Sequence, residues 1–123
     1  AYQMYSMGIS RGDVEVGFHY INPNKVEDYF DSLSEELLDG DCVVSIPTTL
    51  LMKVLYEMFP ENNAAFSHIL SDRLSQAIRD GLPEKHIRVI QTAIAVIKND
   101  PESLPKGEPQ SFVEKWLREE LVV

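Results

Sequence analysis

Val26–Asp41 reads VEDYFDSLSEELLDGD, and its apolar residues recur with the period of an α-helix. They follow the spacing i, i+3, i+4, i+7 and i+11, at Val26, Tyr29, Phe30, Leu33 and Leu37. This spacing places the apolar side chains on one face of a helix, which we expect to be buried against the rest of the protein. Asn24 is a candidate N-cap for this helix, and Gly40 can adopt the left-handed conformation that ends it.

The same stretch is acidic and contains no Lys or Arg. Its seven carboxylates are Glu27, Asp28, Asp31, Glu35, Glu36, Asp39 and Asp41. Four of them are spaced by four residues, and each like-charged i,i+4 pair costs an isolated helix roughly 0.2–0.5 kcal/mol. Local helix stability does not explain this row, whereas a cationic partner would. We therefore predict that the seven acids bind a partner, and the alternative is that they only form a solvated surface.

Two segments around this helix have the pattern of β-strands. Asp13–Tyr20 alternates between apolar and polar residues, as a half-buried strand does. Cys42–Ile46 is a short, β-branched apolar run that ends before Pro47, and it favours a buried strand. Residues 1–12 are predicted to form a short strand or an extended arm. The N-terminal third, residues 1–47, is thus expected to be a strand–helix–strand unit.

The remainder of the chain, residues 48–123, has helical periodicity. Helices are predicted over Thr48–Phe59, from Asn62 or Asn63 to about Asp80, over Glu84 to about Lys98, and after Ser111, where Ser111 and Glu114 match a capping box. The helix from Glu84 is apolar nearly all round, so we place it at the centre of the helical layer. The expected fold is α+β and predominantly helical, with four or five helices packed on a small two- or three-stranded sheet. With 123 residues, it forms a single domain.

The charge balance restricts the classes of partner. The formal net charge is −9, with 20 acidic residues against 11 basic ones. Nucleic acids and anionic membranes are bound through cationic side chains, so neither is expected as a direct partner. A basic protein is expected instead. The single cysteine, Cys42, cannot form an internal disulfide, and the N-terminus lacks the pattern of a signal peptide, so we expect a cytoplasmic protein.

No motif assigns a catalytic residue, a metal ligand or a cofactor. His68 and Asp72 are one helical turn apart, but two residues do not complete a zinc site, and a surface hydrogen bond is the favoured interpretation. His19 is expected on the polar side of its strand and His86 on a helix surface. Cys42 is expected to be a small buried residue rather than a nucleophile.

Three functions remain open. In size and charge the chain resembles immunity proteins, which implies a non-enzymatic inhibitor that covers the active site of a basic, nuclease-type bacterial toxin with its acidic helix. The first alternative is an oligomeric adaptor or regulatory domain, for example a homodimer, that associates through its apolar helices with Trp116, Leu117 and the C-terminus at the interface. The second alternative is a small enzyme that uses His19 or His68 with a neighbouring carboxylate.

Overall fold

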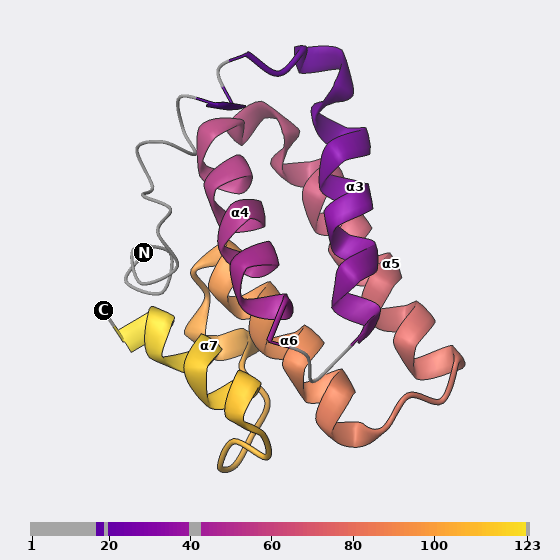
Figure 1. Cartoon of the computed structure of the whole chain (residues 1–123), viewed down its shortest axis with the longest axis vertical. Coiled ribbons are helices and arrows are strands. Elements are labelled where there is room, and N and C mark those ends of the chain that lie inside the picture. Colours follow the sequence, from indigo (N-terminus) through magenta and orange to yellow (C-terminus); the bar gives the residue numbers. More distant parts are fainter. Residues whose placement is uncertain (1–16, 19, 40–42, 123) are drawn as a thin grey trace.

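The computed structural model describes residues 17–18, 20–39 and 43–122, and within these ranges the protein is helical (Figure 1). Four short 3-10 helices in these ranges connect or extend the longer elements: η1 (Pro23–Lys25), η2 (Leu37–Asp39), η3 (Pro60–Asn62) and η4 (Pro101–Ser103). The α-helices, labelled as in Figure 1, are α3 (Val26–Glu36), α4 (Ser45–Met58), α5 (Asn63–Arg79), α6 (Glu84–Lys98) and α7 (Phe112–Val122).

The predicted α+β class is wrong, because no strand occurs in the part of the chain that the structure describes. Gly17 and Phe18 have helical backbone, Val43 and Val44 form a turn, and Ser45 already begins α4. Pro47, which is predicted to follow the end of a strand, lies instead in the first turn of α4, where a missing backbone N–H breaks no helical hydrogen bond. Residues 1–16, His19 and Cys42 lie outside the described ranges, and so does most of the first predicted strand.

Helix α3 begins at Val26 as predicted, but its capping and its end differ. The 3-10 helix η1 (Pro23–Lys25) precedes it, and Asn22 rather than Asn24 supplies a capping side chain, which caps η1. Lys25, at the N-cap position of α3, makes no side-chain capping bond. The Asn22 Oδ1 atom accepts a hydrogen bond of 2.9 Å from the Asn24 backbone N–H. Pro23 explains the shift, because its fixed φ is suited to the first position of a helical turn. The α-helix ends at Glu36 and continues as the 3-10 helix η2 (Leu37–Asp39).

Helix α6 is the centre of the fold, as its composition predicted. It packs against α4, α5 and α7, and its buried residues include Val89, Ile90, Ala93, Val96 and Ile97. Helix α3 packs against α4 and α5, and in Figure 1 it runs beside α5 along one edge of the molecule. The Phe30 ring of α3 stacks on the Phe66 ring of α5, with centroids 4.1 Å apart and an interplanar angle of 18°. The inward face of α3 is therefore fixed by this aromatic contact.

The segment between α6 and α7 is held by a buried ionic cluster. Glu114 of α7 is fully buried, and both of its carboxylate oxygens accept hydrogen bonds from Arg88 of α6, at 3.0 and 2.9 Å. Arg88 also donates to the backbone carbonyls of Lys106 and Glu108, at 2.9 Å each. The predicted capping bond is present, since the Ser111 Oγ accepts from the Glu114 N–H at 3.1 Å. The Glu114 side chain also binds α6, so it serves as more than a cap.

Candidate functional site on helix α3

Helix α3 presents its acids on the side away from the core. Val26, Phe30 and Ser34 are buried on its inner face. Four carboxylates on the outer side are exposed, and the fifth, Asp31, is half-buried. The four exposed ones are Glu27, Asp28, Glu35 and Glu36. The side chain of Asp39 and the whole of Asp41 are outside the described part of the chain. The candidate surface, called the α3 acidic face below, is therefore defined by Glu27, Asp28, Asp31, Glu35 and Glu36.

Arg73 of α5 reaches across to the α3 acidic face. Its Nη2 atom lies 2.7 Å from the Asp31 Oδ1 and 3.5 Å from the Glu35 Oε1. Its Nε donates to the Ser34 Oγ at 2.8 Å, and its Nη1 donates to the Gln76 Oε1 at 2.7 Å. The Arg73 side chain is only 15% exposed. Asp31 and Glu35 therefore contribute to the folded structure through Arg73. The like-charge repulsion within an isolated helix does not reveal this contribution.

The two ends of the face also have neutral partners within the fold. The Thr48 hydroxyl of α4 donates to the Glu36 Oε2 at 2.7 Å. The Asn62 Nδ2, at the start of α5, lies at a longer 3.4 Å from the Glu27 Oε2. Both partners are uncharged, so they orient these carboxylates and leave their negative charge uncompensated.

Asp28 and Glu35 are both exposed on the outer side of α3. None of the described residues forms a hydrogen bond or an ion pair with the Asp28 carboxylate. The Glu35 side chain is 63% exposed, and its one cationic contact is the long one to Arg73. Tyr29, which is 39% exposed, lies beside Asp28 on the same helix and contacts the Phe18 ring edge-on, at 5.9 Å between centroids. This part of the surface thus combines Asp28, which is unpaired among the described residues, and Glu35, which is only weakly paired, with one amphipathic aromatic ring.

Sequence reasoning missed Arg73, and nothing in the local pattern identifies it. Arg73 and Asp31 are separated by 42 positions along the chain, and α5 contains a second arginine, Arg79, that is exposed. Which of the two arginines reaches Asp31 is decided by the packing of α3 on α5. The Phe30–Phe66 contact fixes this packing.

The histidines contribute no comparable site. The His68 Nε2 lies 3.3 Å from the Asp72 Oδ2, and both side chains are largely exposed, which confirms the predicted surface pair. His86 is half-buried on α6, and His19 is outside the described residues. In the described ranges, no three His, Cys, Asp or Glu side chains are placed so that they could hold a metal ion.

The apolar residues predicted for an oligomer interface are mostly buried in the core of the protein. Leu117 is fully buried, and the apolar surface of α6 is buried in the core. Phe112, by contrast, is 60% exposed, with its ring 5.5 Å from the ring of the half-buried Trp116. Among the α7 side chains that the structure describes, these two aromatic residues offer an apolar contact surface.

Comparisons with protein-family models, with curated proteins and with solved structures gave no match. Among the described helices, none combines the length and the apolar character that crossing a bilayer requires.

Proposed function

We propose that this protein is a non-enzymatic, acidic protein-binding domain that acts in the cytoplasm as an inhibitor of the immunity-protein type. Its partner would be a basic protein, such as the nuclease domain of a bacterial toxin. The observation that carries the proposal is the charge of the α3 acidic face, where five carboxylates meet only one cation, Arg73, from the described part of the fold.

Electrostatics gives this surface a physical role. A concentrated field of one sign steers an oppositely charged partner and raises association rates by about 10 to 10³-fold at low ionic strength. A nuclease must hold phosphates with Lys and Arg side chains, and carboxylates on a rigid helix can occupy the same cationic groups. Asp28 has no partner among the described residues, and the Glu35 side chain is 63% exposed with a long contact of 3.5 Å to Arg73, so both carboxylates are accessible to the cations of a partner. Tyr29 adds an aromatic contact of the type that is enriched in protein interfaces.

The test compares two variants with the same net charge. Asp28→Lys/Glu35→Lys reverses the outward part of the α3 acidic face. Glu102→Lys/Glu119→Lys reverses two acids that are exposed on η4 (Pro101–Ser103) and α7. Association rates of the full chain are measured with the purified basic protein encoded by the adjacent reading frame, and nuclease inhibition is assayed in parallel.

We expect the α3 variant to associate about tenfold more slowly at low ionic strength, while the control pair changes the rate much less. Equal effects of the two variants would show that only net charge matters and would remove the proposed site. Absence of binding to the adjacent gene product would remove the inhibitor function.

One observation favours a second candidate, a homodimeric adaptor that associates through α7. The exposed Phe112 ring and the neighbouring Trp116 form an aromatic surface of the kind found at interface centres. Sedimentation across a range of protein concentrations tests it. A dimer that dissociates in Phe112→Ser supports the adaptor, and a monomer at every concentration contradicts it.

A further inference from the structure

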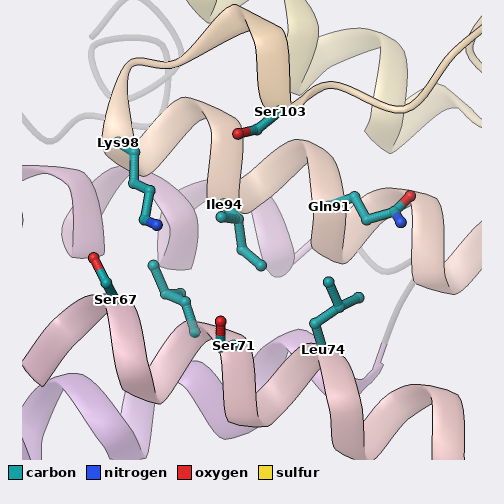
Figure 2. A pocket seen from close by; sticks show the side chains of 8 residues that line it. Ser67, Ser71, Leu74, Gln91, Ile94, Lys98 and Ser103 are labelled. Carbon is teal, nitrogen blue, oxygen red and sulfur yellow. The ribbon is translucent and has the colours of Figure 1, made fainter.

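A groove of about 250 Å³ lies between α5 and α6, separate from the α3 acidic face. Figure 2 shows Lys98 and Ser67 at one end of it and Gln91 and Leu74 at the other. Ile94 and Ser71 lie between these ends, and Ser103 of η4 closes the α6 side. None of the residues that line the groove belongs to α3.

Most polar side chains of the groove have no partner among the residues that the structure describes. In the described part of the chain, no hydrogen bond or ion pair engages the side chains of Ser67, Ser71, Gln91 or Lys98. Ser103 Oγ donates to Asp100 Oδ2 at 2.8 Å, which leaves the hydroxyl oxygen free to accept. Small-molecule sites characteristically combine an apolar lining with a few convergent polar groups, and uncommitted groups of this kind are available to orient a ligand.

The wall between the two polar ends is apolar. Leu70 is almost fully buried beneath the groove, and Leu74 and Ile94 are half-buried along it. An apolar segment of a ligand laid over these three side chains would be removed from water. Such burial contributes about 25 cal/mol per Å².

The charged side chain of the groove determines which polar group a ligand can place there. Lys98 is its single cation, and no carboxylate is among the lining side chains. Two acids close to the lining residues in sequence already have partners. Asp100 accepts from the Ser103 Oγ and, at 3.2 Å, from the Glu102 N–H, and the Asp72 Oδ2 lies 3.3 Å from the His68 Nε2. A metal ion has no anionic ligand here, and an amine would be repelled by Lys98. A carboxylate can pair with the ammonium group and accept from the serine hydroxyls.

We propose that the α5–α6 groove binds a small carboxylic acid with a short unbranched apolar chain. The carboxylate pairs with Lys98 at the Ser67 end, and the chain lies over Leu70 and Ile94 toward Leu74. The groove has a volume of about 250 Å³, just below the range of about 300–1,000 Å³ that small-molecule sites occupy, so a short aliphatic acid is the size of ligand that it suits. Hexanoate is therefore the probe of choice.

The experiment titrates the isotopically labelled full chain with hexanoate and follows backbone amide shifts. We expect saturable shifts on α5 and α6, together with weaker binding of acetate, which lacks the chain, and of hexan-1-ol, which lacks the charge. Lys98→Met should weaken hexanoate binding at least about tenfold, as loss of a charged hydrogen bond implies. Lys25→Met, which removes an exposed lysine on η1, is the matched control and should leave the affinity unchanged.

A second variant tests the location without touching the cation. Ser71 is exposed on α5 at the middle of the groove, so Ser71→Phe fills the groove without placing the ring in the core. It should abolish the hexanoate shifts while the circular dichroism spectrum stays the same. The proposal fails if hexanoate causes no saturable shifts, if Lys98→Met and Ser71→Phe both bind it normally, or if hexan-1-ol binds equally well. None of these outcomes bears on the α3 acidic face.

Discussion

Glu114 is a fully buried carboxylate at the centre of an ionic cluster. Its carboxylate accepts hydrogen bonds from Arg88, from the Gln110 N–H and from Arg118, the last at 3.0 Å. The Arg118 Nε is itself buried without a partner in the described structure, so the cluster already contains one unsatisfied donor. The arginines depend on Glu114 because an unpaired charge is costly in a buried site.

Glu114→Ala should therefore destabilise the protein strongly. Removing one member of a buried ion pair leaves the other without compensation and typically costs about 3–5 kcal/mol. The free energy of unfolding in urea measures the effect. Glu119→Ala is the control, because Glu119 is exposed on the same helix, and it should change stability by less than about 0.5 kcal/mol. If the two substitutions cost the same, the cluster contributes no more than a surface charge.

At the scale of elements, Arg73 joins α5 to α3 and also lowers the charge of the α3 acidic face. Arg73→Met should reduce the free energy of unfolding by about 1 kcal/mol, since Asp31 is 48% exposed and its ion pair is partly screened. The same substitution makes the face more negative, so association with a basic partner should become faster. Arg79→Met removes an exposed arginine from the same helix and gives the reference for both measurements. A slower association for Arg73→Met would mean that the partner contacts Arg73 itself.

The sequence predicted those elements whose signals are local. Helical periodicity located α5 and α6 to within a residue or so, because apolar spacing and the terminal Gly81 and Pro83 act within one segment. The strand predictions failed at Val43–Ile46, where a short apolar run fits a buried helix start as well as a strand. The contacts of Arg73 with α3 and of Arg88 with Glu114 were not predictable. They join residues 26 to 42 positions apart, and only packing decides such pairs.

At the scale of the whole molecule, the net charge of −9 acts on folding and on binding in opposite directions. Like charges repel one another in the compact state, so screening them should stabilise the free protein. Attraction between the α3 acidic face and a basic partner should weaken under the same conditions, because the Debye length falls from about 30 Å at 0.01 M salt to about 3 Å at 1 M.

Raising the salt concentration across this range should therefore increase the free energy of unfolding of the isolated protein while slowing its association with the basic partner. Urea unfolding and stopped-flow association on the same samples measure the two quantities. The Asp28→Lys/Glu35→Lys variant should show a flatter salt dependence of association, because part of the attractive field has been reversed. Were association and stability to decrease together, the loss of binding would reflect a loosened fold. If the association rate did not depend on the salt concentration, the α3 acidic face would not steer the partner. The acids would then form only a solvated surface.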